Sequence, residues 1–126
     1  MDLFFIKELK NKYPHEISAG QAQRVSLVRS IIHNPDLLLL DEPLANIDQY
    51  LKNKIQDNLK QVLKKSGLTT IIVTHDKFEA FYLGDYCGVL LNKRIVQFDS
   101  PYNLHHLPKN KMVVEFFNRG VLIPAK

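Results

Sequence analysis

The chain has 126 residues, the size of one ordinary domain with a real hydrophobic core. Hydrophobic residues make up 45% of it and charged residues 24%, without low-complexity tracts, which argues against global disorder. The formal net charge of +4 comes from lysines spread along the chain, with no basic stretch interleaved with aromatics, so a nucleic-acid partner is not expected.

Cysteine content and hydropathy further limit the classes of protein to which the chain can belong. Cys87 is the only cysteine, which excludes an internal disulfide and a cysteine-based zinc site and fits a reducing cytoplasm. No apolar run approaches the roughly 20 residues that span a bilayer. The first ten residues also lack the basic start and the long apolar segment of a signal peptide. Any membrane role would therefore depend on a partner.

The first predicted element is a helix from about Ala19 to His33. Ser18 and Gln21 form a capping-box pattern, apolar residues follow at helical spacing, and the Asn-Pro pair at 34–35 ends the helix. The apolar run 37–40, between two prolines, then predicts a central strand covered on both faces.

A second, amphipathic helix is predicted from Gln49 to Lys65. Asp48 is its expected N-cap and Gly67 its stop. Residues 69–74, "TTIIVT", are rich in β-branched side chains and predict a second buried strand. Strand, helix and strand in this order indicate a right-handed βαβ unit with parallel strands.

Shorter elements are predicted in the remainder of the chain. They are a helix at 77–83, a hairpin at 88–98 that turns near Asn92 and Lys93, and two helices at about 102–107 and 111–118. No shift in composition marks an internal boundary. The pattern as a whole predicts an α/β fold.

Polar side chains follow both predicted parallel strands. Ligands bind beyond the carboxyl ends of such strands, so we expect Asp41, Glu42 and His75 to share one edge of the sheet. There Asp41 could hold hydrated Mg²⁺, Glu42 could orient an attacking water, and His75 could position that water or a γ-phosphate. The alternatives are a solvated turn for the acids and a structural hydrogen bond for His75.

A second candidate phosphate site lies at the start of the first helix. "ISAGQ", residues 17–21, offers a serine hydroxyl and free helix amides, although an ordinary capping box gives the same pattern. A nucleotide site normally also has a glycine-rich loop, G-x-x-x-x-G-K-[ST], and these 126 residues contain none. We therefore predict weak nucleotide binding and no appreciable ATPase activity for the chain alone.

Four motifs resemble those of the ATP-binding subunits of ABC transporters. "ISAGQ" is similar to the signature motif, "LLLLDEP" (37–43) to Walker B, "ANID" (45–48) to the D-loop and "VTHD" (73–76) to the H-loop. The resemblance implies that residues 1–126 are a partial nucleotide-binding domain, from the signature helix to the C-terminal end. It would be the C-terminal portion of an ABC-type P-loop ATPase domain, with a parallel βαβ core, a late β-hairpin and short C-terminal helices.

The resemblance also implies the cofactors, ATP and Mg²⁺, and the roles of individual residues. Asp41 would serve Mg²⁺, Glu42 would be the catalytic base, His75 would face the γ-phosphate, and Asp48 would communicate across a head-to-tail dimer. The signature residues would contact the nucleotide held by the other subunit; they are Ser18, Ala19, Gly20 and Gln21. Ala19 replaces the first signature glycine and adds a methyl group where backbone approaches phosphate.

The implied partners are a second ABC ATPase subunit or a separately encoded N-terminal half that carries the Walker A loop, together with transmembrane permease subunits. No nucleic acid is expected. The chain would then be cytoplasmic and peripheral on the inner face of the cell membrane. "YPHE" (13–16) and "HDKFEAF" (75–81) resemble importers of ferric iron, polyamines and maltose, and "EFFNRGVLIPA" (115–125) is most similar to the ferric-iron members.

Two alternative functions stay open at this point. One is a non-catalytic interaction module, or remnant, that pairs with an intact ABC ATPase subunit. The other is an ABC-type DNA-repair or chromosome ATPase, against which "YPHE" argues. A central strand without neighbours would expose backbone and apolar surface, so we also expect self-association or marginal solubility.

Overall fold

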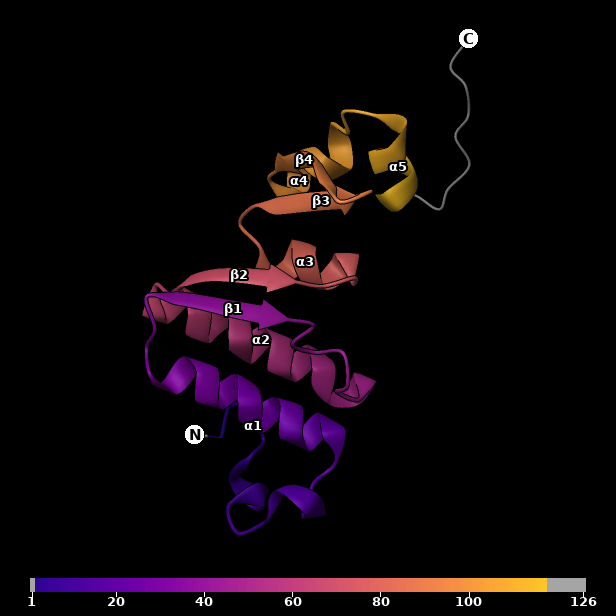
Figure 1. The fold of residues 1–126 in the computed structure, drawn as a ribbon. Coiled ribbons are helices and arrows are strands. Elements are labelled where there is room, and N and C mark those ends of the chain that lie inside the picture. Colours follow the sequence, from indigo (N-terminus) through magenta and orange to yellow (C-terminus); the bar gives the residue numbers. More distant parts are fainter. Residues whose placement is uncertain (1, 118–126) are drawn as a thin grey trace. The chain divides into compact units, whose positions relative to one another are not determined.

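The computed structural model describes residues 2–117 and divides the chain into two compact units, residues 1–75 and 76–126. Figure 1 shows the elements. In the first unit they are η1 (Lys7–Leu9), η2 (Pro14–Glu16), α1 (Ala19–Ile32), β1 (Leu37–Asp41), α2 (Gln49–Ser66) and β2 (Thr69–Val73). In the second they are α3 (Lys77–Leu83), β3 (Cys87–Leu91), β4 (Arg94–Asp99), α4 (Pro101–His106) and α5 (Lys111–Phe117).

Helix α1 begins at the predicted capping box. The Ser18 hydroxyl accepts a hydrogen bond from the Gln21 amide at 3.2 Å, and the Gln21 side-chain oxygen accepts one from the Ser18 amide at 3.0 Å. Two of the four amides that lack an intrahelical partner at the helix start are thereby satisfied. The helix ends at Ile32, one residue before the predicted end, and His33 is its C-cap.

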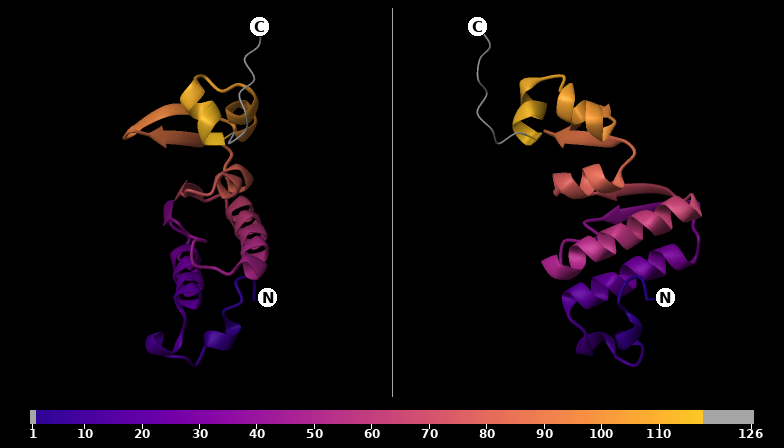
Figure 2. Two further views of the ribbon diagram at one scale, coloured as in Figure 1. Left: turned by 90° about the vertical axis from the view of Figure 1, so that its right-hand side faces the viewer. Right: turned by 180° about the vertical axis from the view of Figure 1, so that it is seen from behind.

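Strands β1 and β2 pair in parallel, as predicted, and α2 connects them in sequence. The register runs from Leu37 opposite Thr69 to Asp41 opposite Val73. Helices α1 and α2 run alongside the strand pair in all three ribbon views (Figures 1 and 2). At the start of α2, Asp48 accepts hydrogen bonds from the two amides at 50 and 51, which confirms it as the N-cap.

The prediction that β1 is covered on both faces is wrong. Leu38 and Leu40 are buried, whereas Leu37 and Leu39 are 48% and 65% exposed. Within the described residues β1 pairs only with β2, and the alternation shows that only one face of the pair is covered. We call the uncovered side the open face; it consists of Leu37, Leu39, Ile71 and Val73.

The covered face of β1 contributes to the core of the first unit. Buried apolar residues of this core are Phe4, Leu9, Leu27, Leu38, Leu40, Leu44, Ile47, Ile55 and Leu59. The segment before α1 is held by polar contacts: buried Arg24 donates to the carbonyls of Phe4 and Phe5, and Asn58 donates to that of Leu3. The side chains of both helices thus fix the backbone of the first residues.

The second unit contains a hairpin and three short helices. Strands β3 and β4 are antiparallel, and the Asn92-Lys93 turn lies where it was predicted. The core of this unit is formed by Val89, Leu104 and Val113. Helix α3 has its predicted bounds, α4 begins and ends one residue earlier than predicted, and the predicted end of α5 at 118 falls outside the described residues. Over residues 2–117, none of the helices has both the length and the apolarity that a bilayer crossing requires.

Candidate active site

Glu42 and His75 meet where β1 and β2 end. The Glu42 oxygen Oε1 lies 2.7 Å from the His75 ring nitrogen Nδ1 and also accepts the His75 backbone amide at 3.0 Å. The imidazole is 81% exposed and the carboxylate 36% exposed, so water or a phosphate can approach the pair. The expected proximity of these two side chains is confirmed.

The proton between this pair constrains what His75 can do. A 2.7 Å contact between Nδ1 and a carboxylate oxygen requires a hydrogen on Nδ1. In the neutral ring, Nε2 is then an acceptor, and it becomes a donor only when the ring is protonated. His75 can therefore accept from a water in its neutral form and donate to a phosphate oxygen as imidazolium.

The backbone at Glu42 is left-handed, with φ of 47°, in a residue that is not glycine. Such a conformation costs on the order of 1–3 kcal/mol and persists only where its surroundings hold it. The Glu42 amide donates to the Val73 carbonyl at 2.8 Å, and the Glu42 carbonyl accepts from the Ala45 amide at 3.2 Å. Neighbouring backbone thus fixes the direction in which the carboxylate leaves β1.

Asp41 is the last residue of β1 and is exposed. It pairs in register with Val73, two residues before His75, so the acid stands at the same edge as the Glu42–His75 pair. No group of three or more metal-ligating side chains exists in residues 2–117. A single carboxylate at this edge suits Mg²⁺, which keeps several waters and takes its other ligands from substrate phosphates.

A cavity of about 360 Å³ lies beside the N-terminus of α1. Its lining includes four of the predicted site residues, which are Ser18, Gly20, Gln21 and Asp48. Ala19, also predicted there, is exposed and is not part of the lining. The structure therefore gathers the predicted residues into two groups, one at the end of the strands and one at the start of α1.

Gly20 lies against the loop that follows β1. A Cβ atom at this position would be 2.4 Å from the backbone oxygen of Asn46, a distance that real Cβ atoms do not show. The glycine is therefore required by the close approach of α1 to the 45–48 loop, and not by a special backbone angle.

Comparison with known proteins shows which protein family this chain resembles. The sequence model of the ABC transporter family matches residues 1–45. The Fe(3+) ions import ATP-binding protein FbpC of Haemophilus influenzae is 37% identical over 99% of this chain and 36% of its own length. The spermidine/putrescine import ATP-binding protein PotA of Aster yellows witches'-broom phytoplasma is 41% identical, over 94% of this chain and 28% of its own length.

The chain is thus similar to ABC transporter ATPases over nearly its whole length. It spans about a third of the length of the curated relatives it matches. A solved ABC ATPase, the ATP-binding cassette MJ0796, also resembles it, with a TM-score of 0.68 and 29% identity over 75% of this chain and 40% of the other. That structure is a dimer in a post-hydrolysis state with ADP and Pi. The predicted ABC-type fold is thereby confirmed.

Glu42 lies in the segment that resembles Walker B, His75 in the one that resembles the H-loop and Gly20 in the one that resembles the signature motif. Asp48, in the segment that resembles the D-loop, caps α2 with its carboxylate, which accepts from the Tyr50 amide at 3.0 Å. Its expected role in communication between subunits remains a prediction, as do the catalytic and binding roles of the other site residues.

One residue of the chain that touches the site was not found from sequence. Gln23 of α1 donates through Nε2 to the carbonyl of Glu42 and accepts through Oε1 from the amide of Asn46. Its partners are 19 and 23 residues away and are backbone groups. No spacing or composition signal marks such a contact, because any residue can supply a backbone carbonyl.

Proposed function

We propose that the chain is the ATP-binding and ATP-hydrolysing part of an ABC importer and energises solute uptake through transmembrane permease subunits. The observation that carries the proposal is the Glu42–His75 pair at the carboxyl edge of parallel strands. The similarity to known proteins supports it, since the relatives named above are import ATP-binding proteins. In the cell it would be cytoplasmic and peripheral on the inner face of the membrane.

Each residue of the site has a proposed role. Bound Mg²⁺–ATP would supply the phosphoryl group and neutralise charge as it is transferred. Asp41 would hold the hydrated ion. Glu42 would accept the proton of the attacking water through Oε2, because Oε1 is bonded to His75. His75 would orient the water or a γ-phosphate oxygen.

The residues at the start of α1 would serve a different nucleotide, bound by a second ABC ATPase subunit. Ser18, Gly20 and Gln21 line the cavity there, and the helix amides at this end favour phosphate oxygens. Ala19, next to them and exposed, would weaken this contact because its methyl group stands where backbone approaches phosphate. Asp48 would take part in communication between the two subunits of the dimer.

A phosphate loop is required to complete the site, and these 126 residues do not contain one. We propose that an N-terminal half that carries this loop supplies it, whether or not that half is joined to these residues. The chain by itself would show no appreciable ATPase activity and only weak nucleotide affinity. Tight, magnesium-dependent binding of ATP to the isolated chain in calorimetry would contradict this part of the proposal.

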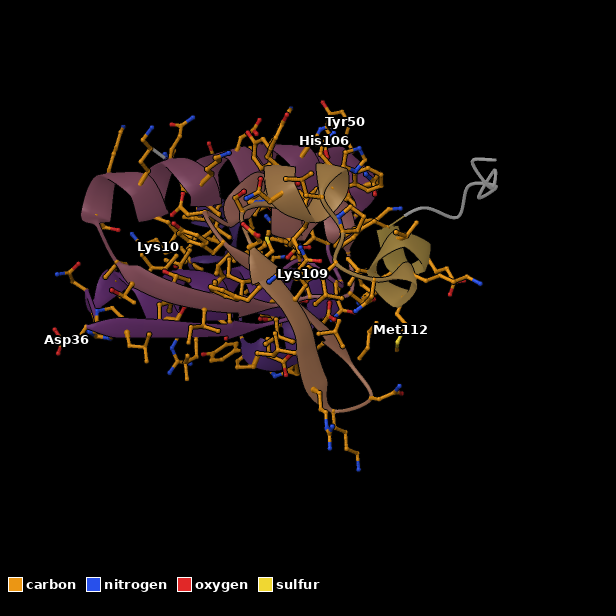
Figure 3. The ribbon with its side chains drawn as sticks, turned by 90° about the horizontal axis from the view of Figure 1, so that it is seen from above. Lys10, Asp36, Tyr50, His106, Lys109 and Met112 are labelled. Carbon is orange, nitrogen blue, oxygen red and sulfur yellow. The ribbon has the colours of Figure 1, made fainter. Side chains whose placement is uncertain are left out.

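The catalytic assignment is tested in the complex with such a half. Glu42→Gln removes the base and keeps the size of the side chain, so hydrolysis should fall by about a hundredfold or more. Asp36→Asn is the matched control, since Asp36 is an exposed acid just before the opposite end of β1 (Figure 3). It should leave the rate unchanged. Comparable turnover in the Glu42→Gln complex would disprove the role of Glu42.

The proposed solute is ferric iron. The Fe(3+) relative is 37% identical over 99% of the chain, and the polyamine relative, at 41% over 94%, makes spermidine the necessary comparison. Cells that express the Glu42→Gln variant in place of the wild-type chain should lose uptake of labelled ferric iron and keep uptake of labelled spermidine. The reverse pattern would assign the importer to polyamines.

A further inference from the structure

We propose that Gln23 is a positioning residue, which holds the backbone of Glu42 so that its carboxylate stays on His75. The inference rests on the proposed function, because it concerns the same Glu42. It goes further in assigning a role to a residue outside the motifs that identify the family.

The contacts of Gln23 span the whole turn after β1. Its Nε2 donates to the Glu42 carbonyl, and its Oε1 accepts from the Asn46 amide at 3.2 Å. A primary amide has a donor and an acceptor at one end, and here both are bonded to backbone four residues apart. The side chain is half-buried, which limits competition from water. Gln23 therefore acts as a clamp across residues 42–46.

A second contact from the same face of α1 supports the clamp. Gly20 lies three residues before Gln23, so the two positions are neighbours on the helix surface. The Asn46 carbonyl packs where a Gly20 Cβ would stand, while the Asn46 amide is bonded to Gln23. Both polar backbone groups of Asn46 thus contact α1, and the turn cannot move from the helix without breaking these contacts.

The clamp acts on a residue that needs support. Glu42 has a left-handed backbone, with φ of 47°, and relaxation toward an extended conformation would swing its carboxylate away from His75. Its carbonyl has two partners, the Ala45 amide within the turn and Gln23 from outside it. Gln23 is thus the side chain of α1 that ties the orientation of Glu42 to the helix that begins at Ser18.

Nuclear magnetic resonance on the full 126-residue chain tests the clamp without nucleotide. Gln23→Met keeps the length of the side chain and removes both hydrogen bonds. It should accelerate hydrogen exchange of the Asn46 amide about tenfold and shift the His75 Nδ1 signal toward that of an unbonded imidazole. Gln23→Glu keeps only the acceptor, so the Asn46 amide should stay protected while the His75 signal shifts.

Gln61→Met, on the exposed surface of α2, is the matched control and should change neither signal. If Gln23 had a purely structural role, both substitutions would accelerate hydrogen exchange throughout β1 and α1. Gln23→Met and Gln23→Glu would then give the same result. An unchanged His75 Nδ1 signal in Gln23→Met would overturn the proposal.

Kinetics in the complex with the N-terminal half separates this inference from the proposed function. Gln23→Met should lower kcat by roughly tenfold to a hundredfold with KM for ATP unchanged, the pattern of a misplaced catalytic group. If Glu42→Gln retains turnover, the proposed function fails. The magnetic resonance experiment then still decides whether Gln23 positions Glu42. If Glu42→Gln abolishes turnover while Gln23→Met matches wild type, the inference fails alone.

Discussion

At the level of single residues, Gly20 is the position in α1 where a side chain has no room. A Cβ atom there would lie 2.4 Å from the Asn46 carbonyl oxygen, which is backbone and cannot rotate aside. Gly20→Ala should therefore lower the free energy of unfolding by about 1–3 kcal/mol, the range for overpacking, despite the better helix propensity of alanine. Urea unfolding followed by circular dichroism measures the loss.

Ala19→Gly is the control for this prediction. Ala19 is exposed in the same helical turn, so its replacement costs only the propensity difference, at most about 1 kcal/mol. Equal stability of Gly20→Ala and the wild-type chain would show that the 45–48 loop moves away from α1 without penalty.

Cys87 supplies a prediction of pH dependence at the same scale. Burial disfavours the thiolate and raises the pKa of the Cys87 thiol above its ordinary value. The thiolate is the reactive form, so alkylation by iodoacetamide at pH 8 should be slower than in the urea-unfolded chain, and the rate should keep rising at pH values where the unfolded chain has reached its plateau. Coincident pH profiles for the folded and unfolded chains would contradict the raised pKa.

At the level of elements, the β3–β4 hairpin turns on two residues with positive φ, Asn92 at 48° and Lys93 at 62°. This is the geometry of a type I′ turn, in which glycine is strongly preferred at the second position. Lys93→Gly should stabilise the hairpin by about 1 kcal/mol, because the left-handed conformation no longer opposes a Cβ atom.

Hydrogen exchange of the paired amides in β3 and β4 measures this gain, which corresponds to roughly fivefold slower exchange. Lys93→Ala removes the charged side chain and retains the Cβ atom, so it should give no such slowing. If both variants protect the hairpin equally, the lysine side chain and not the backbone angle is the source of the effect.

At the level of the whole molecule, the open face predicts self-association. Leu39 and Ile71 are paired in register and are 65% and 54% exposed, on the side of the strand pair that no described element of the first unit covers. The double variant Leu39→Thr, Ile71→Thr should shift the chain toward monomer in analytical ultracentrifugation, because contiguous exposed apolar surface drives association. Leu40→Ala, on the buried face, should instead lower the unfolding free energy by about 2–5 kcal/mol.

If association is unchanged in the double variant, the open face is not the contact surface. The same variant also bears on the proposed complex. An N-terminal half that covers the open face should fail to bind Leu39→Thr, Ile71→Thr, while it should still bind the chain with Glu42→Gln.

The local order of the chain was predictable from its sequence. The capping box at Ser18, the cap at Asp48, the stop at Gly67 and the turn at 92–93 each depend on side-chain chemistry within a few residues, which the sequence states directly. Parallel pairing of the two strands also followed, because a strand, a helix and a strand in succession leave few other arrangements. That pairing was enough to bring Glu42 and His75 together.

Burial and long-range contacts were decided only by the tertiary structure. The run of leucines in β1 predicts burial but does not say how many faces find a partner, and one face of the strand pair stays open. The Gln23 clamp and the approach of Gly20 to Asn46 join residues 19 to 26 positions apart through backbone groups, which every residue carries and no pattern distinguishes. Sequence alone thus determines which elements form and which edge carries the acids, whereas packing determines how firmly Glu42 is held.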